Sequence, residues 1–233
     1  MTRSPGAKAH PYPFQIGYQA TKLIQGSVFY SAFVDAAVGE FVHEHPADAY
    51  QRVEKAFLKH GMNKESIDLS WKCMREYMDI FPSPVFQYSL YSMVIHWDWF
   101  VSQLGNFVYF ARLHDNNPPI RNKQTNKLQK LGMEKTDDQL LLLKAATGLN
   151  FNIENTKYEL FKEMLLVRNL GMHNEWEVDQ FYLERTKTTG WKVGQLRSFT
   201  SSDLFDWQGA LLHILQELAA EISKRYVAIP NYS

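Results

Sequence analysis

The stretch Val85–Leu113 reads VFQYSLYSMVIHWDWFVSQLGNFVYFARL and is apolar or aromatic on most sides of a helix. A helix that is apolar nearly all round is usually buried at the centre of a helical fold. Pro82 and Pro84 interrupt the chain before it, and a loop predicted for residues 114–126 follows it. We therefore predict a mainly α-helical fold with this segment as its central helix.

Shorter segments with helical spacing of apolar residues lie on both sides of this stretch. Asn63 is a plausible N-cap for one of them, because its short side chain can accept a hydrogen bond from the first helical turn. The predicted helices are 14–41, 47–59, 64–78, 125–131, 137–147, one that begins at Asn155 or Thr156, and 201–226.

Residues 176–199 have a different pattern, with apolar residues flanking the turn Thr188-Thr189-Gly190. This pattern predicts a β-hairpin inserted before the last helix. We divide the chain into a flexible N-terminal arm (1–13), an N-terminal helical extension (14–82) and a main helical domain (83–233) that contains the hairpin.

The overall charge excludes one class of function. Lysine and arginine together number 25, aspartate and glutamate together number 25, and the formal net charge is zero. A protein that coats long duplexes needs many cationic contacts with phosphates, so any contact with RNA is expected to be local.

Cys73 is the one cysteine, which suits a reducing compartment. Without a signal-like N-terminus or a long apolar run, we expect a cytoplasmic protein that does not insert in a membrane.

The most concentrated chemistry lies in Arg168–His173, RNLGMH, which closes the apolar helical segment Tyr158–Val167. It combines a permanent cation, an amide and a side chain that titrates near neutral pH, and such a trio can bind a phosphate and move a proton without a metal. The spacing alone is not specific, because Arg3 and His10 form a similar pair in the N-terminal arm. An arm without fixed structure cannot preorganise a site, so the context favours the helical copy.

The longer string RNLGMHNEWEVD extends the motif to Val178-Asp179. It resembles the HEPN superfamily (higher eukaryotes and prokaryotes nucleotide-binding domains), whose ribonuclease-like branches carry an RNxxxHN…VD form at the end of the penultimate main helix. The resemblance covers residues 84–226 and implies an up-and-down helical bundle. Residues 1–80 match no family that we recognise.

This resemblance implies a metal-independent endoribonuclease that cleaves single-stranded RNA. In that role Arg168 binds the scissile phosphate, His173 is the general acid or base, and Asn169 positions the phosphate or His173. One histidine cannot easily act as base and acid in the same event, so a composite site across a homodimer is expected, as in HEPN ribonucleases. A toxin or defence role, with an antitoxin-like protein partner, follows from the same resemblance.

Other polar residues are candidates for supporting roles. His96 and Asp98 lie on the central helix, where in HEPN-like folds a polar residue can face the motif. The resemblance therefore implies that Asp98 orients His173 or binds Arg168; a satisfied polar pair in the core is the alternative. Asn174 is a further supporting candidate. The sequence has no Gly-rich phosphate loop, HExxH or paired-cysteine zinc pattern, so we expect no metal and no cofactor.

A structural interpretation of the motif competes with the catalytic one. Arg168 could bond backbone carbonyls or a carboxylate such as Glu175 or Glu177, while His173 and Asn174 simply cap the helix C-terminus. Under that interpretation the protein is a non-catalytic HEPN-like module that binds nucleotides or proteins, or that dimerises.

Overall fold

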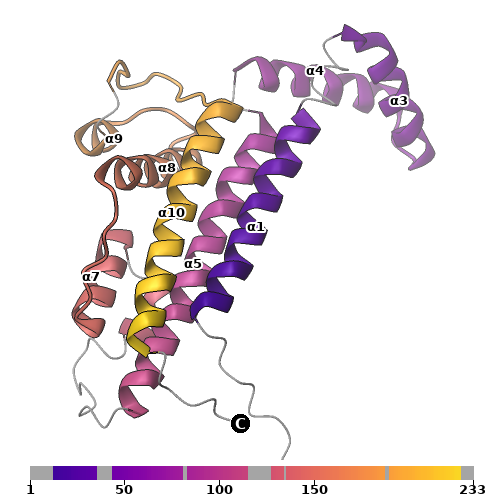
Figure 1. Cartoon of the computed structure of the whole chain (residues 1–233). Coiled ribbons are helices and arrows are strands. Elements are labelled where there is room, and N and C mark those ends of the chain that lie inside the picture. The colour runs from indigo at the N-terminus through magenta and orange to yellow at the C-terminus, as the bar shows by residue number, and fades with distance from the viewer. Residues whose placement is uncertain are drawn as a thin grey trace, which may run out of the picture. The chain divides into compact units, whose positions relative to one another are not determined.

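A computed structural model describes residues 13–35, 44–80, 83–114, 127–133, 135–186 and 189–226. The described residues are mainly helical and contain no β-strand, which confirms the predicted α class. Most of the predicted N-terminal arm (residues 1–12) and most of the predicted loop 114–126 lie outside the described residues. Figure 1 shows the helices, which are α1 (Pro13–Val34), α3 (Pro46–Lys59), α4 (Lys64–Ile80), α5 (Pro84–His114), α7 (Thr136–Thr147), α8 (Asn155–His173), α9 (Gln180–Arg185), α10 (Ser201–Tyr226) and the short 3-10 helix η2 (Leu131–Met133).

The predicted helices 64–78 and 201–226 agree closely with α4 and α10, whereas residues 36–41 of the predicted helix 14–41 and residues 125–126 of the predicted helix 125–131 lie outside the described residues. The side chain of Asn63 accepts a hydrogen bond from the Ser66 N–H at 2.8 Å and so caps α4. At the start of α10, the Thr200 N–H donates to Asp203 Oδ2 at 2.7 Å and the Asp203 N–H donates to Thr200 Oγ1 at 3.4 Å. This reciprocal pair fixes the first turn of the last helix.

The chain divides into two compact units, each drawn from separate segments. The first comprises Met1–Gln25, Met93–Phe161 and Gln208–Ser233, and the second comprises Gly26–Ser92 and Lys162–Trp207. The predicted boundary near residue 82 stays a prediction. Among the described helices, none is both long enough and apolar enough to cross a membrane.

The core of the first unit surrounds Trp97, which is fully buried on α5. Its ring meets Phe161 edge-on, with the ring centroids 4.8 Å apart, and its Nε1–H donates to Gln139 Oε1 at 2.8 Å. The buried indole is therefore packed and also hydrogen-bonded. Gly17 allows α1 to approach α10 closely, because a Cβ added there would lie 3.0 Å from Ala219 Cβ.

Aromatic rings packed at tilted angles form part of the core of the second unit. Trp176 packs against Phe199, which in turn packs against Trp207, with centroid separations of 5.5 and 5.4 Å. Tyr91 lies on the other side of Trp176 at 6.1 Å. These contacts join the residues after α8 to α5 and to the start of α10.

The helices α3 and α4 pack against each other within the second unit, and few of their side chains are buried. The hydroxyl of Tyr50 donates to the Asp68 carboxylate, and its ring meets Trp71 edge-on at 5.6 Å. Lys64 and Glu54 form an exposed ion pair of 2.6 Å. Exposed pairs of this kind contribute little to stability, so the aromatic contact is the main link between the two helices.

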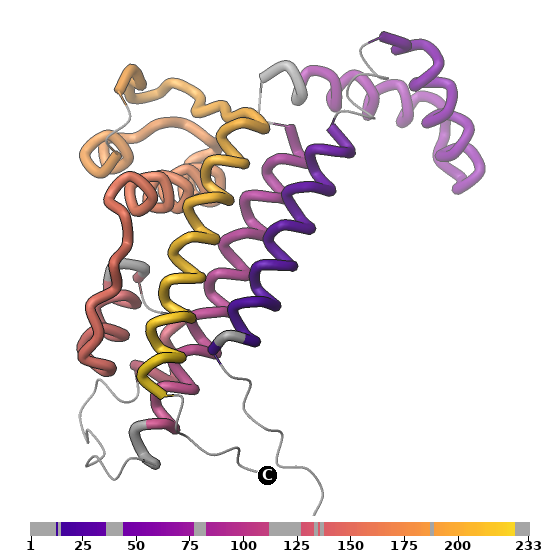
Figure 2. The backbone as a smooth tube through the Cα atoms, in the orientation of Figure 1, coloured from indigo at the N-terminus to yellow at the C-terminus, as the bar shows by residue number. Residues whose placement is uncertain are grey.

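The predicted β-hairpin over residues 176–199 is wrong. The described part of this segment contains α9 and one antiparallel bridge between Glu177 and Leu196, and no strand. Asp179 explains the difference, because its carboxylate accepts the Tyr182 N–H at 2.7 Å and starts a helix where a strand was expected. Val178 and Tyr182, four residues apart, are both buried, whereas Phe181 is exposed. Figure 2 shows the non-helical path that leads from α9 back to α10.

Candidate functional site

The motif Arg168–His173 occupies the C-terminal end of α8, as predicted. The buried face of this helix is spaced every three residues and comprises Phe161, Met164, Val167 and Leu170. Asn169 and His173 are four residues apart, so they project from one side of the helix on successive turns. His173 is exposed and Asn169 is half-buried.

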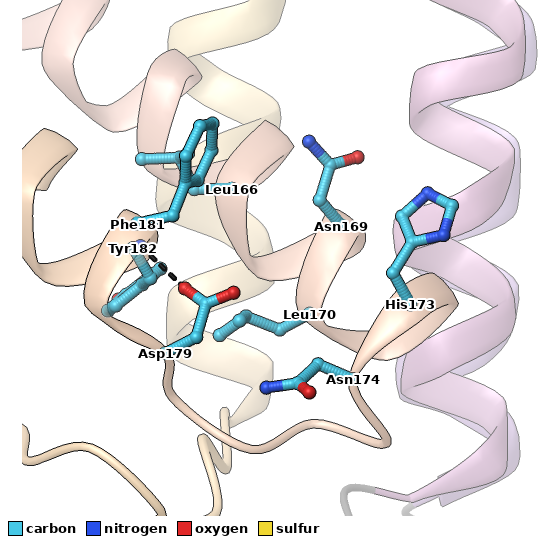
Figure 3. A pocket seen from close by; sticks show the side chains of 8 residues that line it. All are labelled: Leu166, Asn169, Leu170, His173, Asn174, Asp179, Phe181 and Tyr182. Atoms are coloured by element: carbon cyan, nitrogen blue, oxygen red, sulfur yellow. Dashed lines mark hydrogen bonds between the residues drawn. The ribbon is translucent and has the colours of Figure 1, made fainter.

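Both side chains line an open pocket of about 450 Å³. Figure 3 shows the lining residues, with the polar groups of Asn169, His173, Asn174 and Asp179 arranged around the apolar Leu170. The full lining is Leu166, Asn169, Leu170, His173, Asn174, Asp179, Phe181 and Tyr182. The predicted residues Asn169, His173 and Asn174 are therefore brought together in one site.

Arg168 adjoins this pocket through Asn169 without lining it. Its Nη1 donates to Asn169 Oδ1 at 3.0 Å, which orients the amide and leaves the Asn169 Nδ2–H groups as donors. The Arg168 Nε is buried, and no group among the described residues accepts a hydrogen bond from it. Neither Glu175 nor Glu177 forms an ion pair with Arg168, so that part of the structural interpretation is not supported.

The chain turns sharply after His173, and this turn fixes the end of the motif helix. The N–H groups of Asn174 and Trp176 both donate to Leu170 O, at 2.8 and 3.1 Å. Glu175 and Trp176 have φ values of 48° and 68°, in the left-handed region that side chains other than glycine rarely adopt. Two such residues in succession indicate that the surrounding contacts hold the turn in place.

Gly171 is required by this turn. A Cβ added at Gly171 would lie 2.5 Å from two atoms of the Trp176 ring and 2.7 Å from the Tyr91 hydroxyl. The indole therefore packs directly on the helix backbone, two residues before His173. Sequence reasoning missed this contact, because Tyr91 is remote in the chain and the left-handed turn has no glycine to mark it.

Asn174 and Asp179 are both engaged with the backbone of this region. Asn174 Nδ2 donates to Glu177 O at 2.6 Å, so this side chain bonds the chain after α8 and not a carbonyl of the helix itself. Asp179 Oδ1 accepts the Tyr182 N–H. The second oxygen of Asp179 has no hydrogen-bond partner among the described residues and belongs to the pocket lining.

A buried polar cluster anchors Tyr182, one of the lining residues. Arg197 Nη2 and Glu163 Oε1 form an ion pair of 2.9 Å, Arg197 Nε donates to the Tyr182 hydroxyl at 3.1 Å, and this hydroxyl donates to Glu163 at 3.2 Å. Burial raises the pKa of the Tyr182 phenol, and the bond from Arg197 offsets part of this rise. Burial also opposes the charge of Arg197, but the bonds with Tyr182 and Glu163 outweigh it and raise its pKa.

The cluster could not be found from the sequence, because Glu163 and Arg197 are separated by 34 residues and no local pattern pairs them. Its aromatic surroundings are equally remote, since the Arg197 guanidinium lies 4.6 Å from the Trp191 ring centroid and 5.9 Å from that of Trp207. A buried charge with this many partners is structurally satisfied.

The two candidates on α5 do not belong to the same unit as the motif. His96 and Asp98 belong to the first unit, whereas Arg168 and His173 belong to the second. Neither His96 nor Asp98 lines the pocket. Burial lowers the pKa of His96. The suggestion that Asp98 orients His173 or binds Arg168 stays a prediction.

The described residues contain no group of three histidine, cysteine, aspartate or glutamate side chains placed to hold a metal ion. No protein-family model, curated protein or solved structure matches this chain significantly. The resemblance to HEPN proteins is therefore carried by the motif residues and their setting on α8.

Proposed function

We propose that the protein is a metal-independent endoribonuclease of HEPN type that cleaves single-stranded RNA. The observation that carries this proposal is the arrangement at the end of α8. His173 and Asn169 line one open pocket, while Arg168 is tied to Asn169 and has no carboxylate partner among the described residues. An amide and an imidazole thus line the pocket, and a cation without a carboxylate partner among the described residues lies next to them.

The proposed reaction uses each of these groups. A base removes the proton of the ribose 2′-hydroxyl, the 2′-oxygen attacks the adjacent phosphorus, and the bond from phosphorus to the 5′-oxygen breaks as an acid protonates that oxygen. The products are a 2′,3′-cyclic phosphate and a 5′-hydroxyl. An imidazole suits both proton transfers, and such general acid–base help typically contributes about 100- to 10,000-fold. The Arg168 guanidinium stabilises charge on the phosphoryl oxygens.

The reaction requires one group that takes a proton and another that gives one. One His173 cannot do both within a single event, so the proposed site combines the motifs of two copies of the chain around a two-fold axis. The exposure of His173 and the openness of the pocket are compatible with a second copy approaching this end of α8. The proposal extends to an up-and-down HEPN-type bundle within residues 83–233 and to a cytoplasmic toxin or defence effector with an antitoxin-like partner.

The test is RNA cleavage by purified protein in the presence of excess EDTA. Wild-type protein should cleave single-stranded RNA, and His173→Ala should lower the rate at least about 100-fold. The matched control is His60→Ala, because His60 is also an exposed histidine at a helix C-terminus and lies outside the pocket. Equal cleavage by wild type and His173→Ala would overturn the proposal.

One observation favours a second candidate, a non-catalytic module that binds nucleotides or a protein. Arg168 does not itself line the pocket, and its Nη1 is already occupied by Asn169. Under this alternative, mononucleotides or a protein partner bind at the pocket while RNA stays intact. The EDTA-resistant assay separates the two, since the alternative predicts no cleavage by either protein.

A further inference from the structure

We propose that the pocket beside His173 recognises a guanine base next to the scissile phosphate, through the carboxylate of Asp179 and the ring of Phe181. This inference rests on the proposed ribonuclease function and adds a base preference to it. Both residues lie on one short segment, and both line the pocket that contains His173 and Asn169 (Figure 3).

Phe181 offers a stacking surface that its aromatic neighbours do not. Its side chain is 47% exposed, whereas that of Tyr182 is 1% exposed and bonded to the buried cluster. Trp191 is engaged with the Arg197 guanidinium. The Arg185 guanidinium lies 3.7 Å from the Phe181 ring centroid, and Phe181 stays 47% exposed with this cation in place. Aromatic rings and arginine planes are the usual stacking partners of unpaired RNA bases.

Asp179 offers acceptors to a ligand. Its Oδ1 accepts one hydrogen bond, from the Tyr182 N–H, and has a second lone pair that can accept another. Its Oδ2 has no hydrogen-bond partner among the described residues. A carboxylate repels phosphate, so this side of the pocket suits the base of a nucleotide rather than its phosphate. Arg168 adjoins the pocket through Asn169, which leaves the phosphate to Arg168 and His173.

Guanine fits these acceptors because of the pattern on its Watson–Crick edge. It presents two adjacent donors, N1–H and the N2 amino group, which a carboxylate can accept together. Adenine and cytosine each place an acceptor beside their single amino group, and uracil places its one N–H between two carbonyl oxygens. Sites that hydrogen-bond a specific edge discriminate strongly, because the wrong base leaves a polar group unpaired.

The direct measurement is the affinity of the protein for 5′-GMP, 5′-AMP, 5′-CMP and 5′-UMP by isothermal titration. GMP should bind at least about tenfold more tightly than each of the others. Asp179→Asn should abolish this preference, bringing GMP within about twofold of AMP. Asparagine is also a good N-cap, so this variant keeps α9 while replacing an acceptor with a donor.

Phe181→Ala should weaken all four nucleotides by about 5- to 150-fold, since stacking is insensitive to base identity. The matched control is Phe205→Ala. Phe205 is also 47% exposed and does not line the pocket, so its removal should leave every affinity unchanged. Equal affinities for the four nucleotides in wild type, or a GMP preference that survives in Asp179→Asn, would overturn the inference. So would preferential binding of free arginine, whose guanidinium also presents paired donors and would indicate a protein ligand.

Mapping of cleavage positions separates this inference from the proposed function. Cuts clustered at guanines in wild type and scattered in Asp179→Asn support both. Cleavage without base preference overturns the guanine site and leaves the ribonuclease standing. Selective GMP binding without any cleavage overturns the ribonuclease and leaves a guanine nucleotide site.

Discussion

Two arginines of the second unit have contrasting surroundings. Arg197 is 4% exposed, pairs with Glu163, bonds with Tyr182 and Ser198, and lies against two tryptophan rings. Arg168 is half-buried, bonds with its neighbour Asn169, and keeps its Nε without a partner among the described residues. One guanidinium has several partners within the fold, whereas the other is bonded to one neighbouring side chain.

The number of partners distinguishes an arginine with a structural role from one that is a candidate for binding a ligand. A buried ionic group contributes little net stability, but it needs its partners, and their removal is costly. Arg197 fits this description and holds Tyr182, which lines the pocket. Arg168 has no such set of partners among the described residues, which is why the proposed function assigns it to a ligand.

The largest effect on stability is expected from Arg197→Ala. This change leaves Glu163 buried without a cation, which should lower the free energy of unfolding by about 3–5 kcal/mol in urea denaturation. The double variant Arg197→Met with Glu163→Leu removes both charges and should recover most of this loss. If the single variant lowers the free energy of unfolding by less than about 1 kcal/mol, the Arg197–Glu163 pair contributes no more than an exposed ion pair, which contradicts the prediction.

Gly171→Ala should cost about 1–3 kcal/mol, because the new methyl group would overlap the Trp176 ring and the Tyr91 hydroxyl. Gly209→Ala is the matched control. Gly209 also lies within a helix, and a Cβ added there meets nothing within 4 Å. It should stabilise the protein by up to about 1 kcal/mol, since alanine is the better helix former. The same sign for both variants would show that Trp176 does not clamp the motif helix.

Arg168→Gln should change the free energy of unfolding by less than about 0.5 kcal/mol, as expected away from satisfied buried networks. The same variant should lower RNA cleavage about 100- to 1,000-fold, the usual effect of losing a group that stabilises transition-state charge. Urea denaturation and initial cleavage rates check the two halves. Strong destabilisation with unchanged cleavage would reverse the roles assigned to the two arginines.

The smallest expected effect is on the pH dependence of stability and concerns His96, a half-buried side chain of the first unit. Burial lowers its pKa, so below the ordinary value of about 6.5 the unfolded chain takes up a proton before the folded protein does. The free energy of unfolding should therefore fall as pH is lowered from about 7.5 to about 5.5. His96→Gln should remove part of this slope in urea titrations. Superimposable slopes for both proteins would contradict the expectation.

The fold was largely predictable where the signals are local. The apolar density of residues 85–113 and the cap at Asn63 place α5 and α4 correctly. Asp179 is a local signal for a helix, because its carboxylate caps α9 and a buried residue follows three positions later. The alternating apolar residues around it favour a strand, so the two local signals conflict in this segment.

The site was predictable only along its own helix. Asn169 and His173 share a face because helical geometry fixes their spacing, and both line the pocket. The other wall of the pocket depends on contacts between remote residues, such as Arg197 with Glu163 and Trp176 with Tyr91. These contacts form through burial and ring packing between residues that are far apart in the sequence, so no spacing rule predicts them.

The central claim is that two copies of the motif form one reaction site. The most direct test mixes wild-type and His173→Ala protein at constant total concentration, after subunit exchange, and measures RNA cleavage in EDTA. If each site needs both histidines, the rate falls as the square of the wild-type fraction, so an equal mixture keeps about one quarter of the activity. A linear dependence, with about one half of the activity at equal mixture, would contradict the composite site.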